Sequence, residues 1–276
     1  MIETWFRRWV TIFLCICTFT GHAQSVALTF DDGFDPRVDA AAAQSNAQLL
    51  KGLHVAGIRS MLFPAGSMVD SDPGKALVRA WSDAGHLLGN HSYSHRALST
   101  PGLSATVFFD DILRAQEMFE AFPGWCAGLR FPYLDEGSHD ESKAEALLWM
   151  SRHGYGVAAA TISIDDWTYD QRYVAEMRQK SGNDDGILQK LYLDRLWQEA
   201  QRQDAAWTQR LGRAPMHVLL LHANTLNAAV LPDLVSMFRS HGWTFVDPRL
   251  AFSDPIYSRG YVLDGQAQVL PGPRCR

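Results

Sequence analysis

Apolar and polar positions along the chain follow two spacings, one typical of β-strands and one typical of α-helices. Short unbroken apolar runs predict buried strands, and longer stretches with apolar residues every three to four positions predict amphipathic helices. The predicted strands are residues 26–30, 58–64, 87–89, 129–132, 157–164, 217–221 and 244–246. The predicted helices are residues 40–56, 73–85, 104–122, 141–153 and 226–241.

A strand followed by a helix, repeated six or seven times, indicates a parallel β-sheet covered by helices and places the chain in the α/β class. At 276 residues, a closed or partly closed, distorted (β/α) barrel fits this repeat better than an open sheet. Residues at about 170–214 interrupt the rhythm, because they form a helical stretch longer than the barrel requires. We interpret this stretch as a helical insertion.

Acidic and basic side chains stand at or near the carboxyl ends of the predicted strands. They are Asp31, Asp32, His91, Arg130, Asp165, Asp166 and His222. Parallel sheets and β/α barrels build their active sites at this edge. Charged residues with a purely structural role are not expected to cluster at this edge, so the pattern predicts one common active site.

The first predicted strand leads directly into Asp31, Asp32 and Gly33. Neighbouring side chains on an extended backbone point to opposite sides, so the two carboxylates are expected to have different tasks. One could bind a metal ion while the other stays free to accept a proton. Asp-Gly is also a common turn signal, so this stretch taken alone fits a plain strand end equally well.

His91 and His95 are four positions apart, and they share one face if the segment between them is helical. Neutral imidazoles bind Zn²⁺ and similar divalent ions. Two histidines and one carboxylate leave positions open for water and substrate, as catalytic zinc sites do. Histidines at this spacing are common by chance in a chain with ten of them, but the acidic strand end makes a metal site the favoured interpretation.

Charge and the amino terminus narrow the function classes further. The net charge is −5 and no basic cluster follows residue 23, so nucleic acid is not expected as a partner.

Residues 1–23 combine Arg7 and Arg8, an apolar stretch and small residues before Gln24, as a cleaved signal peptide does. The apolar stretch is shorter than the about 20 residues that span a bilayer. We therefore expect a secreted or periplasmic protein without a stable membrane anchor after cleavage.

Cysteines give a weaker signal. Cys15 and Cys17 would leave with the signal peptide, so Cys126 and Cys275 remain. In an oxidising compartment these two could form one disulfide, and two separate thiols fit the sequence nearly as well. The chain has no cysteine-based metal site.

Five short sequence segments are notable both for their residues and for the order in which they occur along the chain. They are Thr29-Phe30-Asp31-Asp32-Gly33, His91-Ser92-Tyr93-Ser94-His95, Arg130-Phe131-Pro132-Tyr133, Asp166-Trp167 and Leu220-Leu221-His222. In this order they resemble the motifs of the polysaccharide deacetylases, carbohydrate esterase family four. The resemblance covers residues 26 to about 246, and the predicted organisation is therefore a single catalytic domain at 24–276.

The resemblance implies a deformed β/α barrel and a divalent metal ion, usually zinc and sometimes cobalt or nickel. It also implies hydrolysis of acetyl groups from N-acetylglucosamine polymers or from acetylated xylan, so the expected partner is an acetylated glycan. Asp32, His91 and His95 match the metal ligands of the family. Asp31 matches the general base, and Arg130 matches the arginine that orients and tunes this base.

The remaining motif residues match groups that contact the substrate or assist the acid. Tyr133 matches the residue whose backbone N–H helps to bind the oxyanion, and Trp167 matches the wall of the acetyl pocket. His222 matches the general acid, and Asp166 matches the carboxylate that pairs with it. Ser163 stands where the family often carries an earlier acid.

Several alternatives stay open at this point. Asp165 is a second candidate for the partner of His222, and we predict Asp166. The insertion is expected near the active edge, where it would cap the cleft and shorten the substrate. An O-acetyl esterase would use the same residues, whereas a non-catalytic glycan-binding relative would lack Asp31 or His222, and both are present. The oligomeric state is not set by the sequence.

Overall fold

The structure, a computed structural model, describes residues 24–137, 140–179, 186–263 and 265–275. The predicted signal peptide, residues 1–23, lies outside the described residues. Across the described ranges, no helix is both long enough and apolar enough to cross a membrane.

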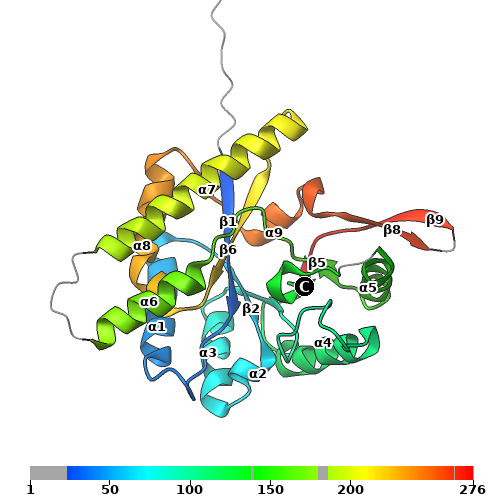
Figure 1. Cartoon of the computed structure of the whole chain (residues 1–276), viewed down its shortest axis with the longest axis horizontal. Helices are drawn as coiled ribbons and strands as arrows, with labels where there is room; N and C mark the ends of the chain where they lie inside the picture. Colours follow the sequence, from blue (N-terminus) through cyan, green and yellow to red (C-terminus); the bar gives the residue numbers. More distant parts are fainter. Residues whose placement is uncertain (1–23, 138–139, 180–185, 264, 276) are drawn as a thin grey trace, which may run out of the picture.

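A curled parallel sheet forms the centre of the molecule (Figure 1). Its strands lie in the order β4 (Trp125–Leu129), β3 (Leu87–Asn90), β2 (Met61–Pro64), β1 (Ser25–Asp32) and β6 (Met216–His222). β7 (Thr244–Phe245) pairs with the start of β1. The distorted (β/α) barrel predicted from the strand and helix repeat is confirmed.

One irregular segment closes the barrel, and it corrects the strand predicted at 157–164. Only β5 (Gly156–Val157) is a strand there, and it pairs with β4. The chain then crosses to β6, where Ile162 forms an isolated parallel bridge with Leu219. A continuous strand is excluded because the segment has to leave one partner strand in order to reach another.

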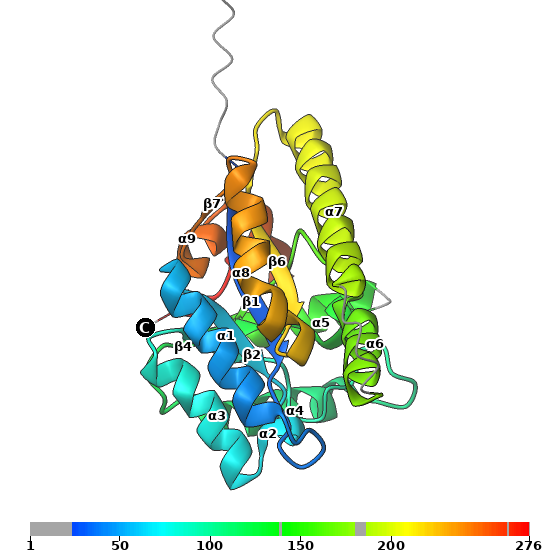
Figure 2. The ribbon, with the colours of Figure 1, turned by 90° about the vertical axis from the view of Figure 1, so that its left-hand side faces the viewer.

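Helices cover the outside of this sheet (Figures 1 and 2). The predicted helices correspond to α1 (Ala42–Ala56), α3 (Asp72–Asp83), α4 (Ala105–Phe119), α5 (Asp140–Arg152) and α8 (Thr225–Ser240). Shorter pieces are α2 (Gly66–Val69), α9 (Pro248–Phe252), η1 (Pro132–Leu134) and η2 (Pro255–Tyr257). Ser71, Ser104 and Asn224 cap α3, α4 and α8, because each side chain accepts a hydrogen bond from a first-turn backbone N–H.

Two helices occupy most of the described residues of the insertion predicted at about 170–214. α6 (Asp166–Arg178) begins within the acidic motif itself, and α7 (Ile187–Leu211) follows it. Residues 180–185 lie outside the described part of the chain. α7 packs against α6 and α8 along one side of the barrel (Figure 2).

The two faces of β1 lie in different surroundings. Val26, Leu28 and Phe30 belong to the apolar layer between sheet and helices. Ala27 belongs to a smaller cluster inside the barrel, and Asp31 follows on the same side because strand side chains alternate. The barrel interior therefore becomes polar toward the carboxyl end of β1.

Arg130 fills this polar end of the interior. Its side chain is fully buried, and its Nη2 donates to Thr29 Oγ1 at 3.1 Å while its Nε donates to the Ala158 carbonyl. The guanidinium carbon lies 4.7 Å from the centroid of the Phe63 ring. A buried guanidinium needs such hydrogen-bond acceptors and a nearby anion. The position of Arg130 therefore provides a buried positive charge beside Asp31.

Cys126 and Cys275, whose pairing the sequence left open, form a disulfide. They are partners in the antiparallel pair of β4 and β10 (Arg274–Cys275). The bond therefore ties the C-terminal strand to the barrel. Before it, β8 (Arg259–Leu263) and β9 (Gln266–Leu270) form a hairpin that extends from the body beside α5 (Figure 1).

The buried ring of His86 is expected to lower the stability of the protein in mildly acidic solution. His86 is 5% exposed, and its Nδ1 accepts a hydrogen bond from the Ser60 backbone N–H at 3.2 Å. Burial, helped by the charge of Arg59, lowers the pKa of His86 from 6.5 to about 4. Between these two values the unfolded chain binds a proton and the folded chain does not, so the free energy of unfolding decreases as the pH falls below 6.5.

Urea unfolding at pH 7 and pH 5 measures this effect. We expect His86 to account for a loss of about 2 kcal/mol in unfolding free energy between the two conditions. A His86→Gln variant should lack this part of the loss, while a variant at the exposed His54 (His54→Gln) should keep it. An equal loss in the wild type and in His86→Gln would refute the assignment.

Candidate active site

The ends of four parallel strands bring the predicted site residues together. Asp31 and Asp32 end β1, His91 and His95 follow β3, Arg130 follows β4, Asp166 starts α6, and His222 ends β6. All of these positions lie at the carboxyl edge of the barrel, where β/α folds place their sites. The single site expected from the strand ends is therefore present as a geometric unit.

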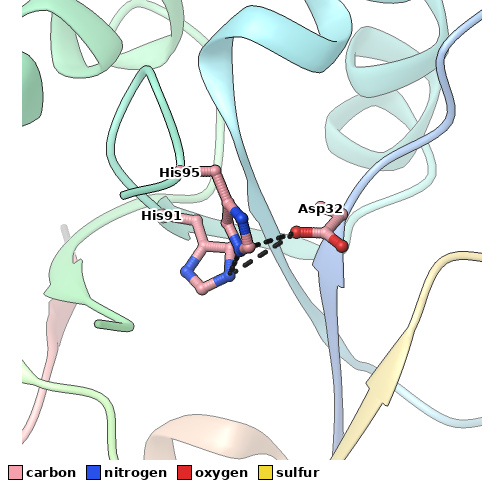
Figure 3. Close-up of side chains that lie close together, drawn as sticks. All are labelled: Asp32, His91 and His95. Carbon is pink, nitrogen blue, oxygen red and sulfur yellow. Dashed lines mark hydrogen bonds and ion pairs between the residues drawn. The ribbon is translucent and has the colours of Figure 1, made fainter. Parts of the chain in front are cut away.

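Asp32, His91 and His95, which we call the metal-ligand group, lie close together (Figure 3). The two Nε2 atoms are 3.2 Å apart, and Asp32 Oδ1 is 3.6 Å from His91 Nε2 and 3.3 Å from His95 Nε2. Ligand atoms about 2.1 Å from a tetrahedral ion lie about 3.4 Å from one another, so the spacing fits such an ion. Asp32 Oδ1 is buried and finds no hydrogen-bond partner among the described residues, which a cation would correct.

His91 is held in the form that can bind a metal ion. It is 2% exposed, and its Nδ1 lies 2.7 Å from the Arg130 carbonyl oxygen. Since a carbonyl only accepts, Nδ1 carries the hydrogen and the Nε2 lone pair faces Asp32 and His95. Burial, followed by the charge of His95, lowers the pKa of His91 well below its usual range, so the ring is neutral.

The segment from His91 to His95 is a loop and not a helix, so the condition under which both rings would share a helix face is not met. Ser92 and His95 have left-handed φ angles of 59° and 53°. These two residues curl the loop so that both rings face Asp32 (Figure 3). The rings meet because of this turn and not because of helical spacing.

Asp31 and Asp32 have different partners, but they do not point to opposite sides. Asp31 Oδ2 and Asp32 Oδ1 lie 3.8 Å and 3.6 Å from the same His91 Nε2. The reason is the backbone, because Asp32 has a φ of 73° and Gly33 a φ of 85°. The Asp-Gly turn considered as an alternative is thus present, and it carries the candidate ligand.

Two residues that the sequence did not single out hold the histidine loop. Asn90 Oδ1 accepts the Ser92 N–H at 2.8 Å. Asp111 Oδ2, on α4, accepts the backbone N–H of Tyr93 at 3.1 Å and both the N–H and the hydroxyl of Ser94 at 2.8 Å. Asn90 could have been suspected from its place at a strand end, whereas nothing in the sequence links Asp111 to this loop.

Replacing Asp111 by alanine is expected to weaken metal binding about ten- to a hundredfold, as the loss of a residue that orients metal ligands typically does. The loop would lose three hydrogen bonds to one oxygen atom, so His95 would no longer be held toward Asp32. Competition with a chromogenic chelator measures the affinity. Asp110→Ala, at the exposed neighbouring position, is the matched control, and equal affinities in the two variants would contradict the prediction.

Asp31 forms an ion pair with Arg130 beside the metal-ligand group. Arg130 Nη1 lies 3.3 Å and 3.4 Å from the two carboxylate oxygens, and Asp31 is 2% exposed. Burial raises the pKa of Asp31 to about 6, against the opposing charges of Arg130 and His222. A carboxylate with this pKa is ionised at neutral pH and is basic enough to accept a proton in a reaction.

His222 pairs with Asp166. Its Nδ1 lies 2.5 Å from Asp166 Oδ1, and its backbone N–H donates to Asp166 Oδ2 at 2.7 Å. Asp166 is fully buried and Asp165 is exposed, so Asp166 is the partner, as expected from the motif. Burial lowers the pKa of His222, but the charge and hydrogen bond of Asp166, followed by the charges of Asp32 and Asp31, raise it to about 10.

Tyr133 and Trp167 lie at the rim of the site, 72% and 51% exposed. Tyr133 has a left-handed φ of 59°, and its ring centroid lies 4.8 Å from that of His95. Trp167 is in the first turn of α6 and lines a cavity of about 460 Å³ together with Asp32 and His222. The insertion therefore borders the cleft through α6, as expected.

The family model for polysaccharide deacetylases matches residues 20–158. A peptidoglycan-N-acetylglucosamine deacetylase of Bacillus cereus is 23% identical over 142 residues, which are 51% of this chain and 46% of that protein. The chain spans less than half the length of the curated relatives it matches. The range matched by the family model contains Asp31, Asp32, His91, His95, Arg130 and Tyr133, and it ends before Asp166, Trp167 and His222.

Solved structures show the same fold. A family 4 carbohydrate esterase from Streptomyces lividans has a TM-score of 0.53 and 22% identity, covering 83% of this chain and 95% of that chain. A CE4 family pseudoenzyme from Bacillus anthracis has a TM-score of 0.55 and 18% identity, covering 81% of this chain and 63% of that chain. Because a pseudoenzyme shares the fold, any chemistry has to be argued from the residues of the site.

Proposed function

Because the chain belongs to the polysaccharide deacetylase family, we propose that it hydrolyses acetyl groups of an N-acetylglucosamine-containing glycan, of the peptidoglycan or chitin type, with a divalent metal ion. One observation carries the proposal. The metal-ligand group lies directly beside both the Asp31–Arg130 pair and the His222–Asp166 pair, because Asp31 Oδ2 is 3.8 Å from His91 Nε2 and His222 Nε2 is 3.9 Å from Asp32 Oδ2. A ligand set, a base and an acid are the groups that metal-assisted amide hydrolysis needs.

Asp32, His91 and His95 would hold the metal ion. Zinc suits two imidazoles and a carboxylate best, and cobalt or nickel accept the same ligands. When bound, the ion would polarise the acetyl carbonyl and lower the pKa of water to about 7. The Arg130 carbonyl supports this role, because it fixes the His91 ring with Nε2 toward the other two ligands.

Asp31 would accept the proton of the attacking water. Its carboxylate is fixed by Arg130 Nη1 and its pKa of about 6 keeps it ionised at neutral pH. His222 would then donate a proton to the departing amine nitrogen. Its pKa of about 10 means that it holds this proton at neutral pH, and its Nε2 lies 3.9 Å from Asp32 Oδ2, on the side of the metal-ligand group.

The rim residues would position the substrate. We assign the backbone N–H of Tyr133 to the developing oxyanion, where a fixed donor stabilises charge in the transition state. Trp167 would form a wall for the acetyl group, because it lines the cavity beside Asp32 and His222. The cavity continues along α6 past Asp170 and Gln171, which gives a neighbouring sugar unit room.

We also propose that the protein works outside the cytoplasm, in the periplasm or after secretion. The signal-like residues 1–23 support this, although they lie outside the described structure. The disulfide between Cys126 and Cys275 supports it independently, because such bonds persist in oxidising compartments. The expected partner is an acetylated glycan and not nucleic acid.

Acetate release by the metal-loaded protein tests the function. The substrates are N-acetylglucosamine oligomers, peptidoglycan and acetylated xylan, each with and without a chelator. We expect release from an amide substrate and its loss on chelation. Release from xylan alone would replace the proposal by an O-acetyl esterase, and silence on every substrate despite metal binding would favour a glycan-binding protein.

A further inference from the structure

Asn227, in the first turn of α8, contacts the His222–Asp166 pair directly. Its Nδ2 donates to Asp166 Oδ2 at 2.7 Å and to the His222 carbonyl at 2.9 Å. Asn227 is 1% exposed. Both acceptors belong to the pair proposed to deliver the proton, so the amide of Asn227 spans its two residues.

The other side of this amide reaches the insertion. Tyr192, on α7, donates its hydroxyl to Asn227 Oδ1 at 2.6 Å. Tyr192 is fully buried, and burial, followed by the nearby Asp166 and Asp170 charges, raises its pKa far above the usual value. The hydroxyl therefore keeps its proton and acts as a donor toward Asn227.

These contacts fix the orientation of the Asn227 amide. Nδ2 faces a carboxylate and a carbonyl, which only accept, and Oδ1 faces the Tyr192 hydroxyl, which donates. A flipped amide would place its oxygen against the Asp166 carboxylate. Without the Tyr192 hydroxyl, the buried Oδ1 would have no donor from α7, and the orientation would be less strongly held.

The orientation of the Asn227 amide determines how Asp166 is held against His222. Asp166 Oδ2 accepts from both the His222 N–H and Asn227 Nδ2, each at 2.7 Å. With Oδ2 occupied in this way, Oδ1 is aimed at His222 Nδ1, 2.5 Å away. The Nδ1 proton fixes the ring so that Nε2 faces the cleft.

We propose that Asn227 and Tyr192 are positioning residues for the His222–Asp166 pair, through which helix α7 of the insertion supports proton delivery from behind the site. This inference rests on the proposed deacetylase function. The insertion would then have two roles, because α6 borders the cleft and α7 supports the His222–Asp166 pair. Neither residue touches the cavity beside Asp32, so both act through Asp166.

The test compares Tyr192→Phe and Asn227→Ala with Tyr169→Phe. Tyr169 is a matched control, because its ring packs 5.5 Å from that of Tyr192, whereas the hydrogen bonds of the Asn227 side chain go to Tyr192, Asp166 and His222. We expect kcat to fall about three- to tenfold in Tyr192→Phe, as the loss of one hydrogen bond implies. It should fall further in Asn227→Ala, and KM should stay within twofold of the wild type in each.

Proton NMR of the metal-free protein supplies a readout that a purely structural role would not move. The Nδ1 proton of His222, assigned by its absence in His222→Gln, should be strongly deshielded by the short bond to Asp166. We expect this resonance to shift upfield or broaden in Tyr192→Phe and Asn227→Ala, and to stay unchanged in Tyr169→Phe. Urea unfolding shows that each variant is folded under the conditions used.

The outcomes separate this inference from the proposed function. If the wild type released no acetate, the NMR comparison would still test the positioning of His222, because it needs neither substrate nor metal. An unshifted His222 resonance in both folded variants would overturn the inference. So would equal kcat values in Tyr192→Phe, Asn227→Ala and the wild type.

Discussion

An Asp31→Asn variant is expected to lower kcat for acetyl release by about 10²–10⁴-fold, the usual contribution of a general base. Asparagine has the size of aspartate and offers an oxygen to Arg130 Nη1, which lies 3.3 Å from Asp31 Oδ1. It cannot take a proton from water, so the step that generates the nucleophile is lost. The metal-ligand group does not include Asp31, and metal affinity should therefore change little.

The neighbouring Asp32→Asn variant is the matched comparison. It removes the carboxylate whose Oδ1 lies within 3.3 Å of His95 Nε2 and 3.6 Å of His91 Nε2, so metal affinity and activity should fall together. Chelator competition measures affinity and acetate release measures kcat. If Asp31→Asn kept its kcat within a fewfold of the wild type, Asp31 would not be the base.

An Asp166→Asn variant should also lower kcat by about 10²–10⁴-fold, here through the general acid. An amide cannot supply the negative charge that outweighs burial and raises the pKa of His222 to about 10. The pKa of His222 would therefore fall, and the ring would lose its proton at a lower pH than in the wild type. The basic limb of the pH–rate profile should move to lower pH.

The same substitution disturbs the hydrogen bonds around the pair. Asp166 now accepts from His222 Nδ1, the His222 backbone N–H and Asn227 Nδ2, and an amide nitrogen would meet one of these donors. Asp165→Asn is the control, because Asp165 is exposed and precedes Asp166 directly. A normal kcat in Asp166→Asn, measured on folded protein, would show that His222 does not need this partner.

The sequence predicted the parts of the site that come from strand ends. Asp31, Asp32 and His222 end strands β1 and β6, and His91 and Arg130 directly follow β3 and β4. Side chains at parallel strand ends have to meet because the strands share one edge. The barrel itself followed from the same repeat. These inferences needed only local periodicity and the rule for parallel sheets.

The local backbone geometry of the site was harder to predict from the sequence. The loop from His91 to His95 depends on left-handed φ angles at Ser92 and His95, which residue spacing does not reveal. The strand predicted at 157–164 is interrupted because this segment has to connect two edges of the barrel. The segment has the apolar composition of a buried strand whether or not the strand is continuous, so composition does not reveal the interruption.

Contacts between distant segments outside the motif residues could not be predicted. Cys126 and Cys275 meet because β10 returns antiparallel to β4, and the sequence left their pairing open. Asp111 reaches the histidine loop from α4, and Tyr192 reaches Asn227 from the insertion. Each contact depends on how a helix is placed on the barrel, which one-dimensional patterns do not determine.

Acetate release during a zinc titration tests the central claim most directly. The metal-free protein would be titrated in the presence of an N-acetylglucosamine oligomer, beside the Asp32→Asn variant. The account predicts no release without metal, a rise that ends at about one equivalent of zinc, as expected for a single three-ligand site, and no rise in the variant. Full release by the metal-free protein, or an equal rise in Asp32→Asn, would contradict it.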